Sequence, residues 1–289
     1  MASAPKSLLP LLSVLICVSS AAALGQSTPL DGIVNHVEEK VEKYVTSLAD
    51  LHCTESVTQE KLGPKGHVEA KEHAQYDYLI MMQGGVDDFQ LNETRIAASS
   101  DKSKPIPTSM LVSNGIATAL LVFHPYYRDS FKFEIGQDET VDGKDLVPIH
   151  FEHIPGRRTP AALALRGREY PLELKGTAWV DRQTDEVVKL EASLVNDMSD
   201  IGLHALQIHV EYKPVPIGKA VSTFDLPMVA VVDVTTARQH WRNTHVFDAY
   251  KSFSTDVEQD PNVKVHVANT VGGTNGVAAN TPEDTKERR

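Results

Sequence analysis

The sequence predicts a mainly β protein: a curved antiparallel meander with an N-terminal amphipathic helix packed on it and a short second helix. Two observations support this fold class. After residue 51, apolar and polar side chains alternate along most segments, which is the period of a β-strand with one buried and one wet face. Before residue 49, apolar side chains recur every three or four residues, which is the period of an α-helix.

The predicted N-terminal helix begins near Asp31, a favourable N-cap residue, and ends near Leu48. On its polar face, Glu39 and Lys43 form a favourable i,i+4 pair. Its apolar stripe must be buried, and the sheet is the surface available to bury it. The stripe consists of Ile33, Val37, Val41, Tyr44 and Leu48. A short second helix is predicted over 113–124, where Ile116, Leu120 and Phe123 share a face.

Alternation with a period of two places the strands of the meander. Asp142-Gly143 lies between two alternating segments and is a strong signal for a two-residue hairpin turn. The basic, proline-containing segment 157–170 is predicted to be a loop with a helical turn. The predicted strands are 52–62, 67–83, 86–96, 131–135, 147–151, 174–181, 188–194, 206–212, 226–236 and 241–253.

The first 25 residues predict a cleavable signal peptide. Lys6 supplies a positive charge, residues 8–18 an apolar core, and Ala21 to Ala23 a small-residue cleavage site. The apolar core is shorter than the roughly 20 residues that a transmembrane helix needs. The chain is therefore predicted to be exported, periplasmic or extracellular after cleavage, and without an integral membrane span.

The rest of the chain divides into two parts. Residues 26–253 are predicted to form a single β-rich domain. Residues 254–289 contain no aromatic residue and no Leu, Ile or Met. Such a segment cannot bury enough apolar surface to offset its ordering entropy, so a disordered C-terminal tail is predicted.

The net charge argues against a nucleic-acid partner, and the cysteine content argues against stabilisation by a disulfide. The formal charge is −11, and it becomes −12 when the signal peptide with its single lysine is removed. An acidic chain repels nucleic acid, so no nucleic-acid partner is predicted. Only Cys53 survives processing, which excludes an intramolecular disulfide. We expect Cys53 to be a buried, small apolar residue.

No residue pattern predicts a catalytic, cofactor-binding or metal site. The densest histidine cluster is His150-Phe151-Glu152-His153, where strand geometry puts His150 and Glu152 on one face and His153 on the other. A zinc site needs three or four converging ligands, and no partner motif is present. The sequence also lacks a G-x-S-x-G nucleophile motif and a Walker loop. The chain is therefore predicted not to be an enzyme.

One hairpin brings a family resemblance. Residues 176–181 read Gly-Thr-Ala-Trp-Val-Asp, and after a turn residues 187–191 read Val-Val-Lys-Leu-Glu. With the signal peptide, helix and meander, this hairpin resembles the LolA, LolB and RseB group of periplasmic lipoprotein carriers and sorting proteins, although Asp185-Glu186 replaces the usual glycine. The resemblance implies an open half-barrel whose apolar concave face is partly covered by helices. In that group the cavity holds lipoprotein acyl chains or serves as a sensory or protein-binding module.

These observations lead to a functional hypothesis. We expect an exported, non-enzymatic binding protein that carries lipid or lipoprotein acyl chains in the apolar concave face. Two alternatives remain: a periplasmic protein-interaction or envelope-stress sensing module, and an exported hydrolase with an unrecognised site. Side chains that simply fill the concave face would leave no cleft. The candidate ligand-cleft residues, which share the apolar side of two adjacent strands, are Leu190, Leu194, Leu206, Ile208, Val210 and Tyr212.

Overall fold

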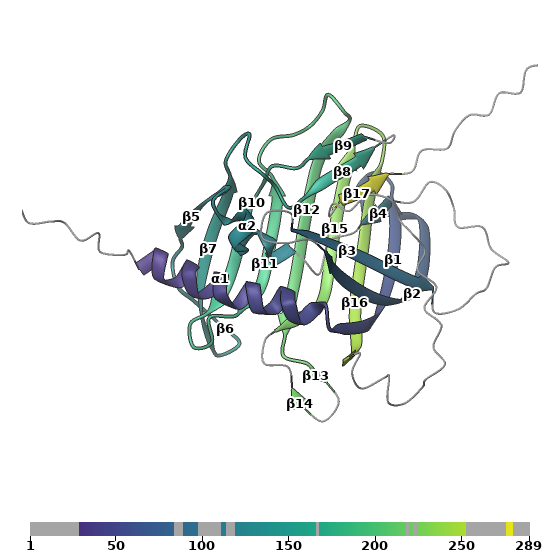
Figure 1. Cartoon of the computed structure of the whole chain (residues 1–289). Helices are drawn as coiled ribbons and strands as arrows, with labels where there is room; N and C mark the ends of the chain where they lie inside the picture. The colour runs from purple at the N-terminus through teal and green to yellow at the C-terminus, as the bar shows by residue number, and fades with distance from the viewer. Residues whose placement is uncertain are drawn as a thin grey trace, which may run out of the picture.

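One large antiparallel sheet forms most of the structure, which is a computed structural model (Figure 1). It describes residues 29–83, 89–97, 111–113, 119–165, 168–217, 220–221, 225–252 and 276–279. The strands of the main sheet are β1 (Leu51–Leu62), β2 (Val68–Gln83), β3 (Gln90–Ala97), β5 (Phe131–Ile135), β6 (Glu139–Val141), β7 (Lys144–His153), β10 (Leu174–Asp181), β11 (Val187–Leu194), β12 (Leu203–Lys213), β15 (Leu226–Thr236) and β16 (His240–Ser252).

Smaller elements surround this sheet. The remaining strands are β4 (Leu111–Ser113), β8 (Ala162–Leu165), β9 (Arg168–Pro171), β13 (Pro216–Ile217), β14 (Ala220–Val221) and β17 (Gly276–Ala279). The helices are α1 (Pro29–Leu48), α2 (Pro125–Arg128) and the short 3-10 helices Pro64–Gly66 and Ala119–Phe123. Strands β4, β17, β8 and β9 form a second sheet in that order, and β13 pairs with β14.

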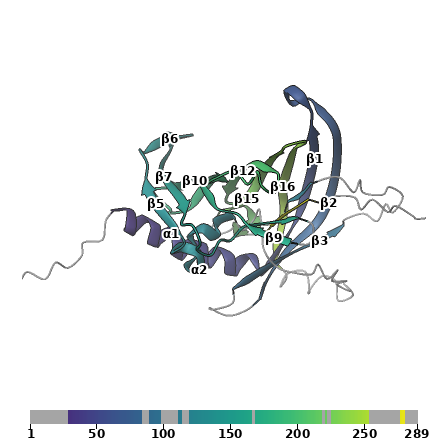
Figure 2. The same cartoon turned by 90° about the horizontal axis from the view of Figure 1, so that it is seen from above.

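The strand order of the main sheet is β3-β2-β1-β16-β15-β12-β11-β10-β7-β5, with β6 beside β7. From β7 to β16 it is a meander, and β16 then pairs with β1 near the other end of the chain. The two edge strands, β3 and β5, lie at opposite ends, so the sheet is open and not closed into a barrel. Seen from above, it is strongly curved, with β1 and β2 arching away at one end (Figure 2). The predicted fold class is confirmed.

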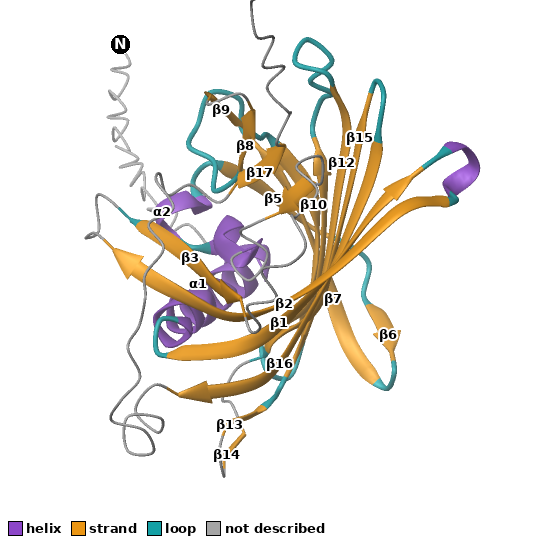
Figure 3. Cartoon of the chain, turned by 90° about the vertical axis from the view of Figure 1, so that its right-hand side faces the viewer, coloured by secondary structure: helices purple, strands orange, loops and turns teal. Residues whose placement is uncertain are grey.

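Helix α1 covers one face of the sheet, called here the inner face; the opposite face is the outer face. Figure 3 shows α1 and α2 on the same side of the fanned strands. The residues that α1 buries are Val34, Val37, Val41, Tyr44, Val45 and Leu48, which include most of the predicted stripe. Ion pairs join the polar side of the helix to other elements, among them Glu38 with Arg128 of α2 and Lys40 with Glu186 at 2.9 Å. The helix is thus fixed to the strands by apolar burial and by charge.

Several local predictions are confirmed. Asp142 and Gly143 both have positive φ, 51° and 79°, as the predicted hairpin turn between β6 and β7 requires. His150 is exposed on β7, while His153 is buried on the other face. Cys53 is buried on the inner face of β1, as expected of a small apolar side chain.

Two local predictions are wrong. Segment 157–170 is not a loop with a helical turn, because β8 and the start of β9 lie within it and pair in the second sheet. The helix predicted over 113–124 is replaced by a strand at Ser113, the 3-10 helix Ala119–Phe123 and, after it, α2. Pro125 is the physical reason for the late start of α2: a proline disfavours helical geometry in the residue before it, and His124 is extended, with φ −66° and ψ 141°.

The predicted C-terminal tail is described over four residues only. Gly276–Ala279 form β17, which pairs antiparallel with β4 and parallel with β8. The rest of 254–289, like the signal segment 1–25, lies outside the described residues. The proposed division into signal peptide, β-rich domain and tail therefore stays a prediction.

Candidate functional site

The six predicted cleft residues lie together on the inner face of β11 and β12. The register places Leu190 opposite Val210 across the two strands. Five of the six side chains are buried, and Ile208 is partly buried. Tyr44 of α1 meets Tyr212 edge to face, with 6.4 Å between the ring centroids. The structure thus brings these residues together beneath the helix.

Tyr212 is the polar member of this apolar group. Its side chain is 1% exposed, and its hydroxyl has no hydrogen-bond partner among the described residues. Burial raises the pKa of Tyr212 above its usual range, so the hydroxyl keeps its proton and can donate it. A buried hydroxyl without a partner costs roughly 1–3 kcal/mol. The Tyr212 hydroxyl is therefore a donor suited to an acceptor oxygen.

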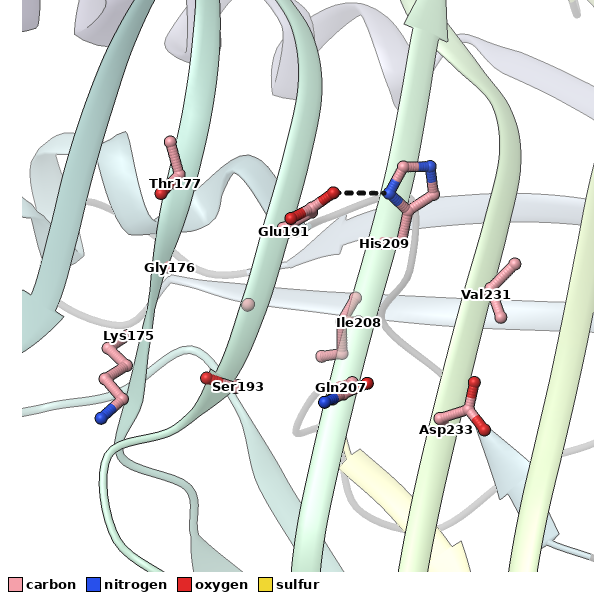
Figure 4. Close-up of a pocket in the computed structure, with 11 residues that line it drawn as sticks. Lys175, Gly176, Thr177, Glu191, Ser193, Gln207, Ile208, His209, Val231 and Asp233 are labelled. Carbon is pink, nitrogen blue, oxygen red and sulfur yellow. Dashed lines mark ion pairs between the residues drawn. The ribbon is translucent and has the colours of Figure 1, made fainter. Parts of the chain in front are cut away.

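A cavity of about 440 Å³ lies on the outer face, over β10, β11, β12 and β15 (Figure 4). Most of its side chains alternate along the strands with the buried ones of the inner face. His209 Nδ1 lies 3.4 Å from Glu191 Oε1, and Lys175 and Asp233 add one charge of each sign. The hydrogen bond from Lys189 is the largest influence on Glu191 and lowers its pKa. Burial opposes this shift, and the charge of Lys189 and the contact with His209 lower the pKa further. Because this surface carries both positive and negative side chains, it does not favour an anionic ligand over a cationic one.

A buried polar cluster occupies the inner face at the other end of the sheet, and sequence reasoning missed it. It consists of Glu55 (β1), Arg95 (β3), Ser113 (β4), Asn243 and His245 (both β16). Glu55, Asn243 and His245 are each at most 1% exposed, and Ser113 is 3% exposed. Glu55 and Ser113 thus reach the cluster from strands of two different sheets.

Hydrogen bonds connect the members of the buried polar cluster into a chain. His245 Nδ1 lies 2.7 Å from Glu55 Oε1, and His245 Nε2 lies 2.7 Å from Ser113 Oγ. Asn243 Nδ2 donates to Ser113 Oγ at 2.9 Å. Arg95 binds both carboxylate oxygens of Glu55, with Nη2 2.8 Å from Oε1. Hydroxyl, imidazole and carboxylate are therefore arranged in series.

The ionisation state of Glu55 follows from these contacts. Burial alone raises the pKa of Glu55, but hydrogen bonds from Arg95 and His245, together with the positive charge of Arg95, outweigh it. The net effect holds the pKa of Glu55 below its usual 4.5. An ionised carboxylate only accepts hydrogen bonds, so Nδ1 of His245 must carry the proton that faces it. In the neutral imidazole, Nε2 is then free to accept the proton of Ser113.

One sequence signal could have pointed to the buried polar cluster. Glu55 falls in the apolar register of β1, between Cys53 and Val57, and a polar residue in such a register needs a partner. Nothing in the sequence names that partner, because His245 is 190 residues away. Among the described residues, no group of three or more His, Cys, Asp or Glu side chains could hold a metal ion.

Comparison with known proteins gives fold similarity only. No family model matches the chain, and no curated protein matches it. It is similar to the crystal structure of a DUF1329 family protein from Desulfovibrio piger, with a TM-score of 0.40 and 11% identity over 81% of this chain and 98% of that chain. It is also similar to a structure described as an outer membrane lipoprotein-sorting protein domain from Vibrio parahaemolyticus. There the TM-score is 0.39 and the identity 10%, over 78% of this chain and 97% of that chain.

Proposed function

We propose that this chain is an exported binding protein that carries a lipid or an acyl chain on the inner face of its sheet. The binding surface is the apolar group of Leu190, Leu194, Leu206, Ile208, Val210 and Tyr212 beneath α1. The observation that carries the proposal is the buried Tyr212 hydroxyl without a partner among the described residues. Binding of this kind requires no catalysis.

The chemistry of the inner face selects the ligand class. Apolar side chains from β11 and β12 gain free energy, about 25 cal/mol per Å², from covering an acyl chain that would otherwise contact water. The Tyr212 hydroxyl supplies one donor for an ester or carboxyl oxygen at the head of that chain. A ligand that satisfies both requirements is amphiphilic, with a long apolar part and one acceptor group. Fatty acids and acyl esters fit this description.

Export is the second part of the proposal and is supported by the sequence of residues 1–25. A charged start, an apolar core and small residues at 21–23 are the marks of a cleaved signal. Among the described residues, no helix is long and apolar enough to cross a membrane. We propose a periplasmic or extracellular location for the mature chain.

Binding of a fluorescent fatty-acyl probe tests the carrier role. Tyr212→Phe removes the hydroxyl alone and should weaken probe binding about 10-fold, the value of one hydrogen bond of about 1.4 kcal/mol. Its unfolding free energy should stay the same or rise, since an unpaired buried polar atom is lost. The matched control is Tyr250→Phe, because the Tyr250 hydroxyl is also buried but donates to the Pro227 carbonyl at 2.6 Å. The control should lose about 1 kcal/mol of stability and no affinity.

Ile208→Asn separates a ligand cleft from a filled core. Ile208 is only partly buried, so an amide there should leave a folded chain that no longer binds the acyl probe. In a filled core the same change would cost about 2–5 kcal/mol through the void and the unpaired amide. Severe destabilisation of this variant, with no probe binding by the wild type, would contradict the carrier role and favour a protein-interaction module.

A further inference from the structure

We propose that Ser113 is a nucleophile, that His245 is its general base and Glu55 the carboxylate that orients the base, and that the chain hydrolyses acyl esters. The geometry is the series of two 2.7 Å contacts, Ser113 Oγ to His245 Nε2 and His245 Nδ1 to Glu55 Oε1. In such a series the hydroxyl is the nucleophile, the imidazole is the base that removes its proton, and the carboxylate orients the imidazole. This activity corresponds to the exported hydrolase considered from the sequence as an alternative.

Each hydrogen bond in the series points in the direction that the reaction needs. The ionised Glu55 accepts from Nδ1 of His245, which leaves Nε2 as the acceptor for the Ser113 proton. Asn243 Nδ2, 2.9 Å from Ser113 Oγ, is a donor close enough to bind the oxyanion that forms beside that oxygen. Arg95 is a positioning residue, because it binds both oxygens of Glu55, the carboxylate that orients the base.

The proposed acyl site and the series of Ser113, His245 and Glu55 lie on the same inner face of the sheet. Leu190 pairs with Val210, Val210 with Ala230, and Ala230 with His245, so the four residues form one row across neighbouring strands. Strands lie about 4.8 Å apart, which places His245 roughly 10 Å from Val210. An ester that leaves the Tyr212 hydroxyl and shifts along this row brings its carbonyl group toward Ser113. The acyl part of the substrate rests on the proposed function, whereas the reactivity of Ser113 does not.

The location of Ser113 also favours access by a substrate. β4 is three residues long and lies at the end of the second sheet, where it pairs with β17. A short edge strand opens locally at a much lower free-energy cost than a strand inside the large sheet. Opening of β4 would admit the substrate while β1 and β16 keep Glu55 and His245 in place, and the return of β4 restores the contact between Ser113 Oγ and His245 Nε2 before the attack.

The reaction balances without a further reactant other than water. The Ser113 oxygen attacks the ester carbonyl carbon, and its proton passes to Nε2 of His245. The bond from the carbonyl carbon to the alcohol oxygen breaks, and His245 returns the proton to the departing alcohol. Water then gives a proton to Nε2 of His245 and attacks the acyl carbon. The bond from that carbon to the Ser113 oxygen breaks, His245 returns the proton to this oxygen, and the carboxylic acid is released.

Labelling with a fluorophosphonate probe tests the nucleophile on the full mature chain. An activated serine oxygen displaces fluoride and becomes phosphonylated, and peptide mass spectrometry locates the label. We expect label on Ser113, none in Ser113→Ala, and a labelling rate at least about 100-fold lower in His245→Gln, the lower end of what a general base contributes. Ser199→Ala is the matched control: the Ser199 hydroxyl lies 3.2 Å from His204 Nδ1 and 3.0 Å from Asp197, but it is exposed and not in series with them. The control should label like the wild type.

Failure of the inference can be distinguished from failure of the proposed function. A folded wild-type chain that leaves Ser113 unlabelled overturns the inference whatever the variants do, even if the chain binds a fatty-acyl probe. Label on Ser113 at the same rate in a folded His245→Gln variant overturns the role of the base. If Ser113 is labelled but the chain hydrolyses p-nitrophenyl acetate and not the long-chain p-nitrophenyl esters, the nucleophile stands and the acyl-chain substrate is wrong.

Discussion

Glu55 and His245 share a 2.7 Å hydrogen bond on the inner face of two neighbouring strands, although 190 residues separate them in the chain. Both side chains are almost completely buried. Burying a carboxylate is expensive unless charge and hydrogen bonds compensate it, and here Arg95 and His245 provide both. This arrangement should therefore contribute to the free energy of unfolding.

Removing the positive partner of Glu55 should be strongly destabilising. Arg95→Met leaves a buried carboxylate without its main partner, which typically costs about 3–5 kcal/mol. Lys71→Met is the control, because Lys71 pairs with Glu60 at 3.0 Å on the outer surface and is 59% exposed. Exposed pairs contribute about 0–1 kcal/mol. Urea unfolding of both variants measures the difference, and equal small losses would show that Arg95 is not needed to bury Glu55.

Stability should fall in acid because of Glu55. Folding lowers the pKa of this carboxyl below its usual 4.5, so the folded state binds fewer protons than the unfolded one. Its contribution is therefore fully present above pH of about 4.5 and is lost as the pH falls through the lower, folded-state value. The difference in unfolding free energy between wild type and Glu55→Gln should shrink between pH 6 and pH 3. A constant difference across that range would mean that Glu55 is not held ionised. Glu60→Gln, from an exposed pair, should give a smaller difference at every pH.

Deleting residues 254–289 should separate folding from reactivity. This segment contains no large apolar side chain, so cooperative unfolding of the main sheet should remain, with a small shift in thermal midpoint. The deletion also removes β17, whose Val277 pairs with Ser113. Fluorophosphonate labelling of Ser113 should therefore change in rate, while acyl-probe binding at Tyr212 stays the same. Loss of cooperative unfolding would show that the segment packs as part of the domain.

The mature N-terminus should lie between Leu24 and Gln26, since small residues follow the apolar core only there. N-terminal sequencing or intact-mass measurement of the exported protein determines it. An intact Met1 in the exported fraction would contradict the predicted signal peptide.

The sequence predicted those helices, strands and turns whose formation depends on residues close together in the chain. The helical stripe of α1 is buried at Val37, Val41, Tyr44 and Leu48, and the hairpin at Asp142 has the positive φ that its sequence requires. The long strands were predicted because each has a buried and a wet face over many residues. The six cleft residues were placed on one face for the same reason.

Pairing between distant segments could not be predicted in this way. β8 and β4 are four and three residues long, too short for a period to be visible, and their partner β17 lies more than 100 residues away. The contact of Ser113 with His245 joins two sheets, so no alternation within either segment indicates it. The buried polar cluster is therefore a property of the folded chain and not of any local motif.

Native mass spectrometry of the mature chain, purified from its own source, shows directly whether a ligand occupies the inner face. If the inner face carries an acyl chain, the measured mass exceeds that of the polypeptide by one lipid or fatty acid that denaturation releases, and the bound fraction is smaller in Tyr212→Phe. A mass equal to that of the bare polypeptide, together with no uptake of a fatty-acyl probe by the same sample, would contradict the claim that the inner face carries an acyl chain.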